Sequence, residues 1–175
     1  MNTSDPPRPT TSPLDISTAT ENDLPLILEF IQNLAEYERL RHECIASIDK
    51  LRATLFSEPP AAEVIIAKLN GKPVGFALFF HNYSTFLAQR GIFLEDLFVN
   101  PEGRGKGVGR ALLGRLAQIA IDRDCGRLEW VVLNWNEPAI GFYRSIGATA
   151  IDEWTTFRIT GDSLTALASG PVATL

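Results

Sequence analysis

The stretch from Leu94 to Leu113 constrains the fold of this chain more than any other part of the sequence. It begins with apolar residues typical of a β-strand, and Asn100-Pro101 ends that strand. Gly105, Gly107 and Gly109 then alternate with larger residues, and apolar residues at helical spacing follow to about residue 124. A glycine-rich turn that enters a helix presents backbone N–H groups at the positive end of the helix dipole. The stretch therefore predicts an anion site, with phosphate as the expected ligand; an ordinary strand-to-helix turn without a ligand is the alternative.

The spacing of these glycines does not fit two common phosphate-binding motifs. A P-loop needs Gly-Lys-Ser or Gly-Lys-Thr, the dinucleotide fingerprint needs Gly-x-Gly-x-x-Gly, and the sequence contains neither. The loop fits Arg-x-x-Gly-x-Gly instead, with Arg104, Gly107 and Gly109. A second motif, Asn-Glu-Pro-Ala-Ile-Gly-Phe-Tyr at 136–143, is followed by Ile-Gly-Ala at 146–148. Together the two motifs resemble the GNAT acyltransferases, in which the loop holds the pyrophosphate of acetyl-CoA.

Three further tracts resemble the diamine (spermidine/spermine) and thialysine acetyltransferase branch of that family: 33–38, 94–99 and 134–138. The resemblance covers about residues 14–169. It implies an α/β GNAT fold, with a mixed central sheet of about six to seven strands and helices on both faces. Gly103 is a departure, since a tyrosine is usual before the Arg-Gly of the loop.

The elements expected from local patterns agree with this fold. A cap at Thr20 with Asp23 three residues on predicts a helix to about Leu40, and a shorter helix begins near Ser47. A third helix follows the glycine loop, a fourth runs from Pro138 to Gly147, and 163–169 is a short last helix. The expected strands are 14–18, 62–69, 74–81, 92–99, 128–133, 148–151 and 155–159, with Asn70-Gly71 as a hairpin turn and 82–91 as a connection.

Composition limits the class of protein. The chain has 175 residues, so 14–175 is expected to form one domain after a disordered, proline-rich tail at 1–13. Its net charge of −5 argues against general binding to nucleic acid or to anionic membranes. Cys44 and Cys125 provide neither metal-ligand spacing nor a disulfide framework, so we expect no metal and a reduced, cytoplasmic setting. No apolar run is long enough to predict a membrane span.

Acetyl transfer to an amine needs a base, a donor to the thioester oxygen and an acid for the thiolate. The resemblance assigns Glu95 as the base, directly or through a water, and Asp96 as a residue that places the amine. The two carboxylates are expected on opposite faces of their strand. Tyr143 is expected to be the acid at the CoA sulfur. The alternatives are two wetted carboxylates at an edge or bulge, and a tyrosine packed in the core.

The remaining site residues also come from the resemblance. Tyr37, Glu38 and Tyr83 are expected to line the acceptor cleft, with a solvated helix end and an ordinary loop as the alternatives. Asn136 is expected at the pantetheine arm, and it also suits a helix N-cap. The residues expected to bind acetyl-CoA are Leu97, Phe98, Val99, Arg104, Gly105, Lys106, Gly107, Val108, Gly109, Arg110, Asn136, Ala139, Phe142 and Tyr143.

The sequence thus predicts an N-acetyltransferase that moves an acetyl group from acetyl-CoA to a primary amine of a small cationic acceptor, such as a polyamine or a thialysine-like compound, in a ternary complex. A protein lysine or N-terminal acetyltransferase is one alternative. A non-catalytic acyl-CoA-binding regulatory module is another. The resemblance also suggests a homodimer formed through residues 155–159.

Overall fold

The computed structural model describes residues 13–170, which divide into two compact units on either side of the Val131–Val132 bond. The expected tail at 1–13 lies outside the described residues except for Pro13. The first unit carries a sheet in the order β1-β2-β3-β4-β5, in which every neighbouring pair is antiparallel except the parallel pair β4 and β5. Its strands are β1 (Leu14–Thr18), β2 (Glu63–Leu69), β3 (Lys72–Ser84), β4 (Gln89–Val99) and β5 (Leu128–Trp130).

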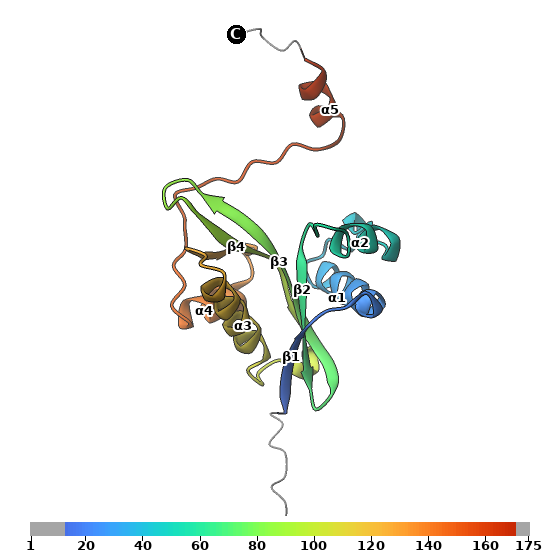
Figure 1. Cartoon of the computed structure of the whole chain (residues 1–175), viewed down its shortest axis with the longest axis vertical. Coiled ribbons are helices and arrows are strands. Elements are labelled where there is room, and N and C mark those ends of the chain that lie inside the picture. The colour runs from blue at the N-terminus through green and yellow to red at the C-terminus, as the bar shows by residue number, and fades with distance from the viewer. Residues whose placement is uncertain (1–12, 171–175) are drawn as a thin grey trace, which may run out of the picture. The chain divides into compact units, whose positions relative to one another are not determined.

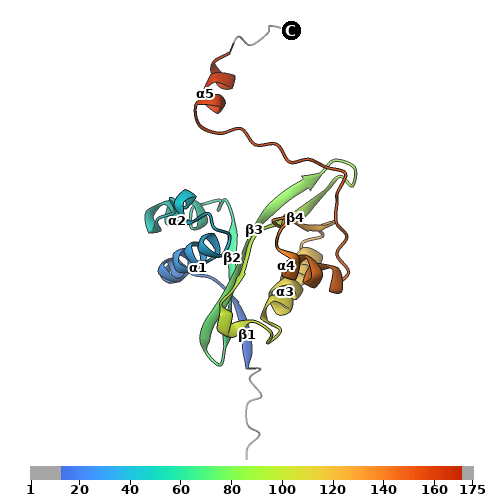
Figure 2. The same ribbon diagram turned by 180° about the vertical axis from the view of Figure 1, so that it is seen from behind.

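Helices cover both faces of this sheet, as predicted. In Figure 1, α1 (Leu24–Tyr37) and α2 (Ile48–Leu55) lie on one side of the strands and α3 (Val108–Asp122) lies on the other. Figure 2 shows the same arrangement from behind. Phe30 of α1 stacks on Phe76 of β3 with ring centres 5.4 Å apart. The ring of Phe98 of β4 also contacts Phe30, with ring centres 6.2 Å apart. Each fully buried aromatic side chain of this kind contributes about 1.5–3 kcal/mol. Short 3-10 turns lie at Glu21–Asp23, Arg41–Glu43 and Pro101–Gly103.

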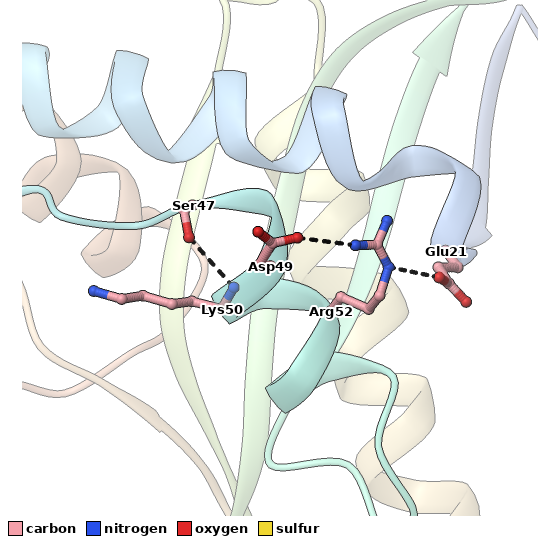
Figure 3. A network of polar contacts seen from close by, with 5 residues as sticks. All are labelled: Glu21, Ser47, Asp49, Lys50 and Arg52. Carbon is pink, nitrogen blue, oxygen red and sulfur yellow. Dashed lines mark hydrogen bonds and ion pairs between the residues drawn. The ribbon is translucent and has the colours of Figure 1, made fainter.

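The start of α2 is tied to the turn before α1 (Figure 3). The Ser47 hydroxyl accepts a hydrogen bond from the Lys50 backbone N–H at 3.3 Å, which confirms the predicted helix start. Arg52 donates to Glu21 at 2.7 Å and to Asp49 at 3.2 Å. Exposed ion pairs each contribute at most about 1 kcal/mol, so this network sets the position of α2 more than it stabilises the fold.

The β2–β3 hairpin has the predicted turn, because Asn70 and Gly71 both have positive φ angles, 51° and 78°. The predicted connection over 82–91 is wrong for most of its length. β3 continues to Ser84 and β4 begins at Gln89, so only four residues form the turn. A long antiparallel ladder lets polar and exposed residues such as Tyr83 pair through their backbone without being buried.

The C-terminal strands differ most from the prediction. β5 pairs with β4 over only three residues, and it is half-buried instead of buried on both faces. Residues 148–151 and 155–159 form no strand in the structure, so the sheet has five strands within residues 13–170 where six to seven were predicted. A β-prone segment becomes a strand only when its backbone pairs with another strand, and among the described residues these two segments have no such partner. Over residues 132–170, the second unit contains two helices, α4 (Glu137–Ser145) and α5 (Gly161–Ser169).

Candidate functional site

A β-bulge in the middle of β4 separates the two adjacent carboxylates. Leu78 of β3 pairs with Asp96, but the next residue of β3, Phe79, pairs with Leu94. Glu95 is therefore the extra residue without a partner in the ladder, as in a bulge. Glu95 is exposed whereas Asp96 is half-buried. The bulge thus gives two neighbouring carboxylates different surroundings.

Asp96 lies in an acidic cluster that it shares with Glu95 and with Glu38 from the end of α1. Burial raises the pKa of Asp96 to about 7, and the negative charges of Glu95 and Glu38 contribute to the rise. Burial also raises the pKa of Glu38. A cationic group bound here would relieve the repulsion between these carboxylates, so the cluster suits a positively charged ligand.

The end of α1 that carries Tyr37 and Glu38 is fixed by a Schellman motif. The Arg39 N–H donates to the Glu36 carbonyl at 3.0 Å, and the Leu40 N–H donates to the Ala35 carbonyl at 2.8 Å. Arg39 adopts the left-handed conformation with φ 63°, where glycine is usual. The helix therefore ends in one defined geometry, which sets where Tyr37 and Glu38 lie.

Arg104 connects the glycine-rich loop to both of these elements. Its Nε donates to the carbonyl of Val99, the last residue of β4, at 3.0 Å. Its guanidinium carbon lies 5.0 Å from the centre of the Tyr37 ring, within the range of a cation–π interaction. The loop is thereby joined to the end of β4 and to the end of α1.

The glycines of the loop serve its backbone conformation. Gly105 and Gly107 have φ angles of 70° and 79°, and Gly107 caps the start of α3. No heavy atom lies within 4 Å of a Cβ built on either glycine, so the positive φ angle and not crowding requires glycine here. Gly103 differs, because a Cβ there would lie 3.0 Å from Val99 and 3.1 Å from Val74. The small residue at this departure from the family pattern is packed against the ends of β3 and β4.

The remaining predicted cofactor residues lie on α4, in the second unit. The Asn136 side chain accepts a hydrogen bond from the Ala139 N–H at 3.4 Å, so it caps α4. The rings of Phe142 and Tyr143 lie side by side with centres 5.5 Å apart. The helix ends at Ser145, and Gly147 follows its C-cap with a φ angle of 91°.

Within the first unit, the structure brings most of the predicted site residues together around the end of β4: Tyr37, Glu38, Glu95, Asp96, Leu97, Phe98, Val99, Arg104, Gly105, Lys106, Gly107, Val108, Gly109 and Arg110. Tyr83 is not among them. It pairs with Arg90, five residues before Glu95, which corresponds to about 16 Å along the strand.

Sequence analysis named a bulge at the two carboxylates only as an alternative in which both are wetted, and it did not predict the half-burial of Asp96 or the contact between Arg104 and Tyr37. Both depend on what a strand or side chain meets across the fold. A bulge can be located only when the register of the two paired strands is known. The contact joins residues that are far apart in the sequence.

His81 lies in a separate polar group with Arg123 and Glu63. Its Nε2 is 3.4 Å from Nη1 of Arg123, whose Nη2 donates to Glu63 at 2.8 Å. Burial and the Arg123 charge lower the pKa of His81. Glu63 is already neutralised by Arg123, so this group offers no unpaired charge comparable to that of the acidic cluster.

The described part of the chain contains neither a metal-binding cluster nor a membrane-spanning helix. Across residues 13–170, no cluster of three or more His, Cys, Asp or Glu side chains is arranged to hold a metal ion. None of the helices in that range is both long and apolar enough to cross a membrane.

Comparison with known proteins identifies the family. The model of the acetyltransferase (GNAT) family matches residues 28–148, which include the bulge, the glycine loop and α4. This chain belongs to the GNAT acetyltransferase family. The predicted family and α/β fold class are therefore confirmed, and the protein is an acetyltransferase. Members of this family use acetyl-CoA as the acetyl donor.

Individual relatives agree with this assignment. The chain is 37% identical to the thialysine N-epsilon-acetyltransferase of Bos taurus over 164 residues, covering 87% of this chain and 96% of the relative. It is 32% identical to the L-ornithine N5-acetyltransferase NATA1 of Arabidopsis thaliana, covering 87% and 86% of the two chains. Among solved structures, an integron cassette protein from the mobile metagenome of V. cholerae superposes with a TM-score of 0.77. That protein is 33% identical and covers 91% of this chain and 100% of its own. The predicted branch, which includes thialysine acetyltransferases, is confirmed.

Proposed function

We propose that this enzyme acetylates the terminal primary amine of a small cationic acceptor by direct attack in a ternary complex. The observation that carries the proposal is the acidic cluster of Glu38, Glu95 and Asp96. Glu38 comes from the end of α1, and Glu95 and Asp96 come from β4, the strand that leads into the glycine loop. The names of the relatives support the same class of acceptor, since thialysine and L-ornithine both carry a terminal amine. Polyamines remain within this class because they are also small cations.

The cofactor would be held chiefly by backbone groups. Acetyl-CoA supplies the acetyl thioester. The N–H groups of residues 105–109 at the start of α3 suit its pyrophosphate, because they lie at the positive end of the helix. Lys106 and Arg110 are exposed beside that helix start and add positive charge. The backbone N–H of Phe98 or of a near neighbour, just beyond the bulge, is our candidate donor to the thioester oxygen.

The amine would be bound as a cation and then deprotonated. A free alkyl amine has a pKa of about 10.4, so well under 1% of it is neutral at pH 7. Glu38 and Asp96 would bind the charged form, and Glu95 would accept the proton directly or through a water. Tyr143 of α4 would return a proton to the departing thiolate, and Asn136 would support the pantetheine arm.

One screen tests this proposal. Purified protein is incubated with acetyl-CoA and, separately, with thialysine, L-ornithine, spermidine and a lysine-containing peptide, and release of free thiol is followed. Turnover of at least one small amine, well above that of the peptide, is the expected result. Turnover of the peptide alone would indicate a protein acetyltransferase. Binding of acetyl-CoA without turnover of any amine would indicate a regulatory module.

The variant Tyr143→Phe is the matched control for catalysis in this screen. It keeps the ring and removes only the hydroxyl, so the protein should fold and bind CoA normally. If the Tyr143 hydroxyl is the general acid, its removal should lower kcat by about 10²- to 10⁴-fold. Nearly normal turnover in this variant would mean that water or another group protonates the thiolate.

We also propose that the enzyme is a homodimer that uses residues 155–159. Four large apolar side chains in and beside this segment are exposed, and a second copy would cover them: Ile151, Trp154, Phe157 and Ile159. Light scattering at micromolar protein should give twice the monomer mass. A monomeric mass would contradict this part of the proposal.

A further inference from the structure

We propose that Arg104 and Tyr37 act as positioning residues that couple the cofactor loop to the amine site, so that binding of CoA and binding of the amine strengthen each other. This inference rests on the proposed function, because it assigns the loop to CoA and the acidic cluster to the amine. It goes beyond that function by giving the two sites a physical connection.

The connection runs through four neighbouring side chains. Arg104 opens the loop, and its guanidinium lies over the Tyr37 ring at 5.0 Å while its Nε is held by the Val99 carbonyl at 3.0 Å. Glu38 follows Tyr37 directly in the chain and is close enough to Asp96 for its charge to act on that carboxyl. A movement of the Arg104 side chain would therefore move Tyr37 and, with it, the Glu38 carboxylate that would bind the amine.

The two ends of this connection differ in how firmly they are held. The end of α1 is fixed by the paired hydrogen bonds of its Schellman motif, so a force on Tyr37 also acts on Glu38. The loop after Arg104 is exposed, and a Cβ built on Gly105 or Gly107 would meet no heavy atom within 4 Å. A pyrophosphate bound to the loop N–H groups would fix the backbone that carries Arg104, and the guanidinium would then be held over Tyr37.

A guanidinium in this position also has an electrostatic role. It lies between a loop that is expected to hold the negative pyrophosphate and a helix end that carries the carboxylate of Glu38. By linkage, any tightening of CoA binding by the amine must equal the tightening of amine binding by CoA. A cation–π contact contributes about 0.5–2 kcal/mol, which corresponds to a coupling of about two- to thirtyfold.

The test measures this coupling as a ratio. Calorimetry gives the Kd of CoA, which lacks the acetyl group and cannot react, alone and with the acceptor that the wild type acetylates fastest. In the wild type, the acceptor should tighten CoA binding about two- to thirtyfold. In Arg104→Gln and in Tyr37→Leu the ratio should fall to nearly one, and the double variant should lose no more than either single variant.

Two controls separate coupling from general damage. Tyr37→Phe keeps the aromatic ring and should keep the ratio. Lys106→Gln removes a positive charge from the same loop but leaves the Arg104–Tyr37 contact, so it should weaken CoA binding equally with and without the acceptor. Thermal unfolding confirms that each variant is folded.

The outcomes distinguish this inference from the proposed function. If the wild type turns over amines but the ratio is one, or if Tyr37→Leu keeps the wild-type ratio, the coupling is disproved and the proposed function stands. If additive losses are found in the double variant, Arg104 and Tyr37 act separately and the inference is again disproved. If no amine is turned over, the proposed function itself fails.

Discussion

The two parts of the proposed site in the first unit are built in opposite ways. The glycine loop at 104–109 offers backbone N–H groups at the start of α3, and two of its glycines are needed for their positive φ angles. The acidic cluster offers side chains from two separate elements, the end of α1 and the bulge of β4. A backbone site is set by local conformation, whereas a side-chain site depends on which elements pack together. Substitutions should therefore affect the two parts through different physical causes.

The largest expected effect is on the acidic side, at Glu95. Glu95→Gln removes a proton acceptor but keeps the size of the side chain, so we expect the rate at pH 7 to fall about 10²- to 10³-fold, within the range for general base catalysis. The difference in rate between the variant and the wild type should be smaller at about pH 9.5, because more of the amine is then neutral without a protein base. Steady-state kinetics from pH 6 to 10 measure both effects. A variant with the wild-type rate and pH profile would show that Glu95 is not the base.

The second prediction concerns the pH dependence of stability. The folded pKa of Asp96 is raised to about 7, above its value in the unfolded chain, so unfolding releases a proton between about pH 4 and 7. Asp96 therefore lowers the free energy of unfolding increasingly as the pH rises through this window, and the decrease levels off above pH 7. Asp96→Asn should remove this pH-dependent decrease in stability. Because one pKa unit corresponds to about 1.4 kcal/mol, the difference between the proteins should reach a few kcal/mol near pH 7.

Urea unfolding of the wild type and of Asp96→Asn at several pH values between 4 and 8 measures this difference. A saturating acceptor should reduce it, because a bound cation would stabilise ionised Asp96. Parallel pH profiles for the two proteins would mean that Asp96 titrates at its ordinary pKa and that the cluster is more solvated than the structure indicates.

On the backbone side, we expect Gly107→Val to weaken CoA binding about tenfold or more. A non-glycine residue in the left-handed region costs about 1–2 kcal/mol, so the loop would change its conformation and turn N–H groups away from the ligand. Gly114→Val is the matched control: it introduces the same side chain into α3, where a Cβ meets nothing within 4 Å. Calorimetry with CoA compares the two variants. Equal affinities would contradict a backbone-bound pyrophosphate.

The smallest expected effect lies where the two parts meet, at the end of α1. Arg39→Gly relieves the left-handed conformation and should stabilise the protein by about 0.5–1 kcal/mol. Gly147→Ala makes the opposite change at the end of α4, where the same pair of hydrogen bonds surrounds a glycine, and should destabilise by a similar amount. Thermal unfolding measures both. A loss of stability in Arg39→Gly would show that contacts of the arginine side chain outweigh its backbone strain.

The sequence by itself determined the features that depend on local chemistry. The Asn70-Gly71 turn, the caps at Ser47 and Asn136, the helix end at Gly147 and the glycines that open α3 were all readable from residue types and their spacing. The family was predicted from the resemblance of the loop and of the motif on α4 to known members, and the loop glycines have few substitutes because they adopt positive φ angles.

Only the tertiary structure decided the features that depend on partners across the fold. The register of β3 against β4 made Glu95 a bulge residue and gave Asp96 its buried, acidic surroundings. Arg39 occupies a position where the sequence contains no glycine to mark the helix end. Residues 148–151 and 155–159 have the composition of strands but form none, since a strand requires a paired edge as well as suitable residues. Local conformation is thus encoded by neighbouring residues, whereas pairing, burial and the charges around a side chain arise only when distant segments meet.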